Sequence, residues 1–422
     1  MSETLRINIQ SEIGELEGVI LHSPGAEVEN MTPGTAQRAL YSDILNLSIA
    51  QNEYSQLSGV LNKYSKVFHI EDLLKKVLDN YRSREALIGK ICISEEATDY
   101  FEDLMDLNSK DLARSLIEGV PAKINSLTAY LKDEYYALYP LYNFYFTRDA
   151  SVSIGNDVMI CKMANKVRMR ESLIMEAIFK NSGEFNCGTI NMNDINPGNN
   201  NIYIEGGDVL IASDDILLIG NGLRTSTQGI DALISRLCKK KSERKKHIIV
   251  QQLPNTPESF IHLDMVFTLL DCNKCMVFEP LILGDNQYQT VHITIDNGKV
   301  SKIKSVSNIP SVLRKLGMDL EPITCGGNAD EWDQEREQWH SGANFFAIAP
   351  GKVLSYARNV HTLNELSKNG FEIIPAWDIV NGKKDANNYD KCVITIDGSE
   401  LPRGGGGARC MTMPIKRKEI IW

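Results

Sequence analysis

Apolar runs interrupted by tight turns recur along the chain, and each pair of runs predicts a β-hairpin. Residues 151–161 (SVSIGNDVMIC) and 208–220 (DVLIASDDILLIG) share one form, in which two apolar strands flank a short polar turn. Residues 264–281 predict a third hairpin, turning at 271–274, and residues 344–356 predict a fourth. The repetition indicates one structural unit that is used several times.

The spacing of these units is regular. The valines at equivalent positions of the first three hairpins lie 57 residues apart: Val152, Val209 and Val266. Helical patterns follow the first, second and fourth hairpins, at 170–180, 229–238 and 363–368. A hairpin-plus-helix unit at such spacing predicts an α/β array in which neighbouring units bury one another's faces. A strand at 18–25, paired with a strand at 392–397, could supply a fifth unit and close a ring.

The pattern changes to helical between about residues 71 and 133. Apolar residues there recur at helical spacing with charged residues between them: Leu73, Leu74, Val77, Leu78, Leu112, Leu116 and Ile117. Proline is absent from this region except at Pro121. We therefore expect residues 71–138 to form a helical insertion within a single catalytic domain that spans residues 1–422.

Composition narrows the class of protein. The 422 residues are 43% hydrophobic, and their net charge of −10 predicts no general attraction to nucleic acid or to anionic lipid. Apolar runs fall short of the roughly 20 residues that span a bilayer, so no membrane association is expected. Nine scattered cysteines without an export signal indicate a reducing, cytoplasmic compartment. We further expect a homo-oligomer.

Candidate chemistry centres on Cys410, which follows a run of four glycines (404–407) and Arg409. Glycines let a backbone approach a ligand closely, and a nearby positive charge favours the reactive thiolate. Taken alone, the stretch is equally well explained by a buried structural cysteine. The segments before the three phased hairpins favour a catalytic cysteine, because they carry polar residues at equivalent positions.

These segments read FTRD (146–149), EGGD (205–208) and HLD (262–264). Equivalent ends of repeated units converge around a pseudo-symmetry axis, so their polar residues are expected to meet near the cysteine. The expected catalytic set is Asp149, Glu205, His262, Asp264 and Cys410. Taken singly, each of these residues is more often structural, and only their common phasing favours a catalytic site.

The carboxylates in this set indicate a cationic substrate. Several acids around a thiol would raise its pKa and weaken it as a nucleophile, unless the substrate brings positive charge. A guanidinium is planar, always cationic and pairs bidentately with carboxylates. His262 could then protonate a leaving amine and later activate water.

Two arginines share one offset from these motifs. Arg168 lies 19 residues after Asp149, and Arg224 lies 19 residues after Glu205. The shared offset predicts that both point toward the centre, where they could hold an anionic group such as an α-carboxylate. Surface salt bridges at helix starts explain the spacing equally well.

Eight motifs occur in order along the chain: LHSPG (21–25), NFYFTRD (143–149), KVRMRE (166–171), IEGGDVL (204–210), HLDMVF (262–267), REQW (336–339), AIAPG (347–351) and RGGGGARCMTMP (403–414). Together they resemble the arginine deiminase family of the guanidino-group-modifying superfamily. The resemblance implies a five-bladed pseudo-symmetric α/β propeller of ββαβ units with an inserted helical bundle. It also implies hydrolysis of L-arginine to L-citrulline and ammonia through a covalent amidino-cysteine intermediate, without a cofactor or a metal.

The resemblance also assigns roles to residues. Cys410 would be the nucleophile and His262 the general acid and base, with Glu205 beside it, while Asp149 and Asp264 would grip the guanidinium. The implied substrate-binding residues are Arg168, Arg224, Asn143, Phe146 and Arg403. Three other functions stay open: an amidinotransferase, an arginine dihydrolase and a non-catalytic arginine-binding protein.

Overall fold

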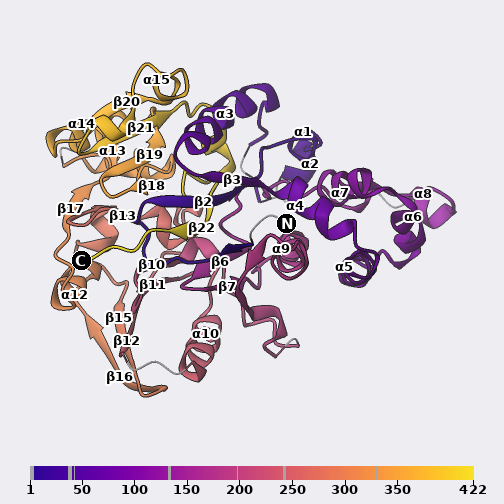
Figure 1. Ribbon diagram of the computed structural model, residues 1–422, viewed down its shortest axis with the longest axis horizontal. Helices are drawn as coiled ribbons and strands as arrows, with labels where there is room; N and C mark the ends of the chain where they lie inside the picture. The colour runs from indigo at the N-terminus through magenta and orange to yellow at the C-terminus, as the bar shows by residue number, and fades with distance from the viewer. Residues whose placement is uncertain are drawn as a thin grey trace.

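The computed structural model shown in Figure 1 describes residues 4–36, 40–41, 43–131, 135–196, 198–240, 244–328 and 330–422. It has a mixed α/β fold in which one unit recurs. In the first unit β6 (Ser151–Ile154) and β7 (Asp157–Ile160) form an antiparallel hairpin. The chain returns through α9 (Met169–Asn181) and places β9 (Gly188–Asn191) parallel to β7.

The next three sheets repeat this order of a hairpin, a helix and a parallel strand. The second contains β10 (Val209–Ser213), β11 (Ile216–Asn221), α10 (Thr227–Lys239) and β12 (Lys246–Gln252), extended by β15 (Thr290–Asp296) and β16 (Lys299–Val306). The third contains β13 (Phe267–Asp271), β14 (Lys274–Val277), α12 (Ile309–Lys315) and β17 (Glu321–Thr324). The fourth contains β18 (Phe346–Ala349), β19 (Lys352–Tyr356), α14 (Val360–Lys368), β20 (Glu372–Pro375) and β21 (Cys392–Ile396). All four expected hairpins are thus confirmed.

The fifth sheet joins the two ends of the chain, as the ribbons of β2 and β22 show in Figure 1. β22 (Met413–Arg417) pairs antiparallel with β2 (Leu16–Leu21), and α3 (Leu47–Tyr64) leads to β3 (Lys66–His69), which lies parallel to β2. The expected pairing of the N-terminal strand with residues 392–397 is therefore wrong. β21 is buried along its whole length because it lies between β19 and β20, whereas Pro414 fits the edge position of β22.

The helical block follows β3 and extends to one side in Figure 1. It contains α4 (Ile70–Leu78), α5 (Tyr81–Ser94), α6 (Phe101–Asp106), α7 (Ser109–Glu118) and α8 (Leu127–Leu131). The expectation of helix throughout is wrong at its end, where β4 (Val120–Pro121) pairs with β5 (Tyr136–Leu138). Gly119 with φ +98° ends α7, and Pro121 cannot extend a helix. Residues 132–134 of this block lie outside the described residues.

Apolar contacts join the block to the sheets. One continuous core runs from Leu74 of α4 through Ile91 of α5 and Ile174 of α9 to Met159 of β7. The shorter elements are β1 (Leu5–Arg6), α1 (Ala26–Glu29), α2 (Pro33–Ala36), β8 (Phe185–Asn186), α11 (Glu279–Ile282), α13 (Glu331–Trp339) and α15 (Ala376–Val380). Within the described part of the chain, no helix is both long and apolar enough to cross a membrane.

The central position of β21 can be tested by mutation. Ile394 is fully buried, with Leu354 and Ile374 as its neighbours on the two flanking strands. Ile394→Ala should lower the free energy of unfolding by about 2–5 kcal/mol, because it leaves a cavity. Ile303→Ala on β16, where the side chain is 64% exposed, should change it by less than about 0.5 kcal/mol. Equal urea midpoints for the two variants would contradict this placement.

Candidate active site

Short turns at the starts of three hairpins carry the predicted polar residues. Glu205 immediately precedes a one-turn 3₁₀ helix, η4 (Gly206–Asp208), that leads into β10. His262 immediately precedes an equivalent helix, η6 (Leu263–Met265), that leads toward β13. Asp149 closes a turn by donating its N–H to the carbonyl of Phe146, just before β6. The repeated unit therefore brings similar backbone positions to one place.

His262 lies between two of the expected carboxylates. Its Nε2 is 3.0 Å from Glu205 Oε2, and its Nδ1 is 3.7 Å from Asp149 Oδ1. All three side chains are buried. A Cβ added to Gly207 would lie 2.4 Å from the His262 ring, so this approach requires glycine.

These contacts set the charges of the pair. Burial opposes the charge on His262, but Asp149 and the hydrogen bond with Glu205 outweigh it and raise the pKa of His262 to about 9. Burial would likewise raise the pKa of Glu205, but Arg224 and His262 lower it to about 2. The pair is therefore an imidazolium facing a carboxylate at neutral pH.

Cys410 is buried beside the third expected carboxylate. Its Sγ lies 3.6 Å from Asp264 Oδ2 and 3.8 Å from Asp264 Oδ1, and its side chain is almost fully buried. Burial and the charges of Asp264 and Asp149 raise the pKa of the Cys410 thiol well above its ordinary value. These surroundings therefore keep the sulfur in its unreactive, protonated form.

Asn344, which the sequence did not single out, contacts Cys410, the expected nucleophile. Its Nδ2 donates to Cys410 Sγ at 3.2 Å, and its Oδ1 accepts from the N–H of Arg409 at 2.8 Å. A Cβ on Gly407 would lie 2.6 Å from Asn344 Oδ1. The asparagine stands at the start of the fourth hairpin, which is the same kind of position as Asp149 and His262. This position at the start of a hairpin is the sequence feature from which Asn344 could have been predicted as a site residue.

Arg168 and Arg224 both face the site carboxylates. Arg168 Nη1 donates to Asp149 Oδ2 at 2.7 Å, and its Nε and Nη2 donate to Glu171 at 3.0 and 2.8 Å. Arg224 Nη1 lies 3.8 Å from Glu205 Oε1. Neither side chain forms the surface salt bridge that the spacing left open, because Arg168 is 5% and Arg224 15% exposed.

The other three expected binding residues differ in position. Asn143 is buried, and its carbonyl accepts from Arg168 Nη2 at 3.4 Å. Phe146 is buried under the glycine run, since a Cβ on Gly406 would lie 2.5 Å from its ring. Arg403 is 45% exposed and pairs with Asp43 at 2.5 Å and with Glu400 at 3.7 Å. Asn143 and Phe146 thus lie beside Arg168 and the glycine run, whereas Arg403 lies at the surface, away from the site carboxylates.

Two of these carboxylates and His262 are arranged as the ligands of a metal ion could be. Asp149, Glu205 and His262 each present one ligand atom, and these atoms lie within 4.8 Å of one another. A cation already occupies this position, because Arg168 Nη1 is 2.7 Å from Asp149 and 3.9 Å from Glu205. A metal would also require a neutral His262, whose pKa is raised to about 9. The arrangement fits a guanidinium better than a metal ion.

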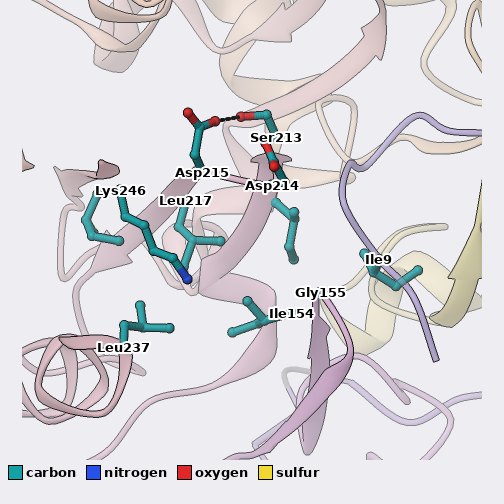
Figure 2. A pocket seen from close by; sticks show the side chains of 11 residues that line it. Ile9, Ile154, Gly155, Ser213, Asp214, Asp215, Leu217, Leu237 and Lys246 are labelled. Atoms are coloured by element: carbon teal, nitrogen blue, oxygen red, sulfur yellow. Dashed lines mark hydrogen bonds between the residues drawn. The ribbon is translucent and has the colours of Figure 1, made fainter. Parts of the chain in front are cut away.

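Figure 2 shows a separate cavity, where side chains near the turns of β6–β7 and β10–β11 meet. Its lining is largely aliphatic, with Ile9, Ile154 and Leu237 beside Lys246, and Ser213 donates a hydrogen bond to Asp215 at its edge. It contains none of the residues described above. The residues described above lie at the other ends of these hairpins, around Cys410.

Comparisons with known proteins agree with the motifs. The family model "Arginine deiminase" matches residues 37–417. The curated arginine deiminase of Bacillus cereus (strain B4264) is 34% identical over 98% of this chain and 99% of its own length. The arginine deiminase of Staphylococcus aureus (strain JH9) is 32% identical over the same shares.

Solved structures support the fold. The N-terminal domain of a cyanobacterial arginine dihydrolase, solved with substrate bound, matches 95% of this chain and 98% of its own with a TM-score of 0.52 at 13% identity. An amidinotransferase from Microseira wollei matches 99% of both chains with a TM-score of 0.53, also at 13% identity. These identities are low, so the structural matches establish the fold alone. The family model and the curated relatives show that this chain belongs to the arginine deiminase family.

Proposed function

We propose that this protein hydrolyses free L-arginine to L-citrulline and ammonia. The observation that carries the proposal is the buried Cys410 thiol, which lies 3.6 Å from Asp264 in a site that also holds Asp149 and Glu205. Such a thiol becomes a nucleophile only when positive charge arrives, and a guanidinium supplies that charge. Membership of the arginine deiminase family supports the same substrate.

In the first half of the reaction, Asp149 and Asp264 accept hydrogen bonds from the guanidinium. The added positive charge lowers the pKa of the thiol, which loses its proton to solvent, and the Cys410 thiolate then attacks the guanidino carbon. His262 carries a proton at neutral pH because its pKa is raised to about 9. It gives this proton to the departing nitrogen, the carbon–nitrogen bond breaks and ammonia leaves, so that the substrate's amidino carbon, still attached to its ornithine chain, is bound to sulfur.

In the second half, water replaces ammonia. The neutral His262 takes a proton from the water while the oxygen attacks the amidino carbon. The carbon–sulfur bond then breaks as the new hydroxyl gives its proton to the departing thiolate, which releases citrulline and restores the thiol. Glu205, 3.0 Å from His262 Nε2, stabilises the imidazolium that recurs in both steps. One histidine therefore serves as the acid and then as the base.

The substrate's α-carboxylate is assigned to the arginines. Arg224 is the freer of the two, because its nearest carboxylate oxygen lies 3.8 Å away. Arg168 is engaged by Asp149 and Glu171 and contributes mainly charge. Asn143 and Phe146 line the position of the substrate's carbon chain. Arg403 lies in the glycine-rich segment that must move to admit a substrate, because Cys410 is 2% exposed.

Two rival reactions use the same nucleophile. In an amidinotransferase an amine replaces water as the acceptor, and in a dihydrolase the product is ornithine. Membership of the arginine deiminase family favours water as the acceptor. A non-catalytic arginine-binding protein would not need the imidazolium of His262 beside the thiol site.

The finer features of the architecture also belong to this proposal. The five sheets with an antiparallel pair and a parallel third strand support a five-bladed α/β propeller of ββαβ units. The core that joins α4, α5 and α9 to β7 supports one catalytic domain over 1–422, with an insertion at 71–138 that is mainly helical and ends in the β4–β5 pair. All nine cysteines are unpaired thiols, which supports the cytoplasm as the compartment. The homo-oligomer stays a prediction.

Replacing the nucleophile tests the proposal. Cys410→Ala should abolish citrulline formation, whereas Cys272→Ala, at an exposed hairpin turn, should retain most of it. Quenching the wild type during turnover should add the mass of arginine less ammonia to the peptide that contains Cys410. Citrulline formation by Cys410→Ala, or an adduct at another cysteine, would contradict the assignment.

Replacing Arg224 tests whether the substrate is the free amino acid. Arg224→Ala should lower kcat/KM for arginine by roughly 30-fold or more, since a lost buried charge contact costs about 2–5 kcal/mol. It should change the much lower value for agmatine, which lacks the carboxylate, only slightly. Arg314→Ala, which removes an exposed arginine, is the matched control and should leave kcat/KM unchanged for both substrates. Equal losses for both substrates would refute the carboxylate contact.

The charge on His262 predicts a pH dependence of stability. Its pKa in the folded protein, about 9, exceeds the ordinary value of 6.5, so the proton stabilises the folded state. This contribution is complete below about pH 6.5 and disappears as pH rises through about 9. The free energy of unfolding lost in His262→Gln should therefore shrink across this window. A loss that stays constant from pH 6 to 9.5 would mean that His262 is neutral in the folded protein.

A further inference from the structure

Glu12, in the N-terminal segment, contacts an arginine of the candidate active site. No motif around residue 12 predicts this contact. Glu12 precedes β2 and is buried, with 6% of its surface exposed. Its two oxygens accept bonds from Arg409 Nε and Nη2, each at 3.0 Å, and Oε1 also accepts from the N–H of Ile211 at 3.1 Å. The contact with Arg409 is bidentate, which fixes the plane of the guanidinium.

The other edge of the same guanidinium holds the active-site carboxylate. Arg409 Nη1 donates to Asp264 Oδ2 at 2.8 Å, and that oxygen lies 3.6 Å from Cys410 Sγ. Arg409 Nη2 also donates to the carbonyl of Val209 at 2.9 Å. Each guanidinium nitrogen is thus engaged, and Arg409 has one orientation. The direction of Asp264 follows from that orientation.

The charges around Glu12 make it the counter-ion of a buried cationic group. Three arginines face it, Arg148, Arg409 and Arg417, each at most 2% exposed, and Asp264 is the other carboxylate in contact with Arg409. Burial would raise the pKa of Glu12, but these arginines lower it to about 2. Glu12 is therefore charged at any pH at which the enzyme would work.

We propose that Glu12 is a positioning residue for the reaction, which it influences by fixing Arg409 and, through Arg409, the Asp264 carboxylate beside Cys410. The inference rests on the proposed function for its effect on turnover. Glu12 touches neither the thiol nor, in this assignment, the substrate. It has two effects on the site: it sets the direction of Asp264, and it takes up part of the positive charge of Arg409.

Removing the charge of Glu12 has a predictable consequence for the thiol. In Glu12→Gln the amide cannot accept both bonds from Arg409, so the guanidinium loses its fixed orientation. Its charge is then no longer shared and acts more strongly on Asp264 and Cys410. Since Arg409 lowers the pKa of the thiol and Asp264 raises it, the thiol should become more acidic. A purely structural role would leave this acidity unchanged.

Glu12→Gln should lower kcat/KM for arginine by about 10- to 100-fold, the usual effect of losing a group that orients a reacting residue. Glu12→Asp keeps the charge and should recover part of the activity. The matched control is Glu176→Gln, which removes a carboxylate of similar burial (5% exposed) that pairs with Lys90 at 3.0 Å. This control should keep kcat/KM within about threefold of wild type.

The second readout needs no turnover. The rate of alkylation of Cys410 by iodoacetamide is followed against pH by mass spectrometry, with the exposed Cys272 of the same molecule as reference. In Glu12→Gln the midpoint for Cys410 should move to lower pH, while the midpoint for Cys272 stays unchanged. If Glu12→Gln does not fold, Arg409→Lys takes its place in the activity assay and should lose kcat/KM to a similar extent.

The outcomes separate this inference from the proposed function. A loss of kcat/KM no larger than that of Glu176→Gln, or an unshifted Cys410 midpoint, overturns the positioning role even if arginine is hydrolysed. If the Cys410 alkylation midpoint shifts but the protein does not hydrolyse arginine, the positioning of Asp264 is supported and the proposed reaction is contradicted.

Discussion

The structure depends on the compensation of buried charge at the point where the sheets meet. A carboxylate removed from water stays ionised only when hydrogen bonds and opposite charge replace its hydration. Arg409 supplies both to Glu12 and Asp264, and Arg168 supplies both to Asp149. The turns before the hairpins bring these groups together, so the fold and the site share one set of ion pairs. Where compensation is incomplete, as at Asp208, burial raises the pKa, there to about 6.

This compensation explains how a reactive thiol can be kept inactive. Cys410 is buried among carboxylates that raise its pKa, so in the free protein its sulfur is protonated and weakly nucleophilic. Arg168 donates to Asp149 at 2.7 Å, so part of the charge of this carboxylate is already compensated. An arriving guanidinium adds the positive charge that the thiol lacks. Substrate binding and activation of the nucleophile are therefore the same electrostatic event in this account.

The sequence predicts the repeated unit well but not the contacts between distant segments. The hairpins follow from local alternation, and the common phasing placed Asp149, Glu205 and His262 together because equivalent turns converge. The pairing of β2 with β22 and the short strands β4 and β5 were missed, since both depend on tertiary contacts rather than on local pattern. The contact of Arg409 with Glu12 joins residues 397 positions apart, and no periodicity encodes it.

The central claim is that water accepts the amidino group and that the reaction stops at citrulline. Incubation of the purified protein with L-arginine alone, followed by quantification of citrulline, ornithine and ammonia, tests it most directly. The account predicts equal amounts of citrulline and ammonia and no ornithine, because one carbon–nitrogen bond is hydrolysed per substrate. Ornithine with two equivalents of ammonia, or turnover only after an acceptor amine is added, would contradict it.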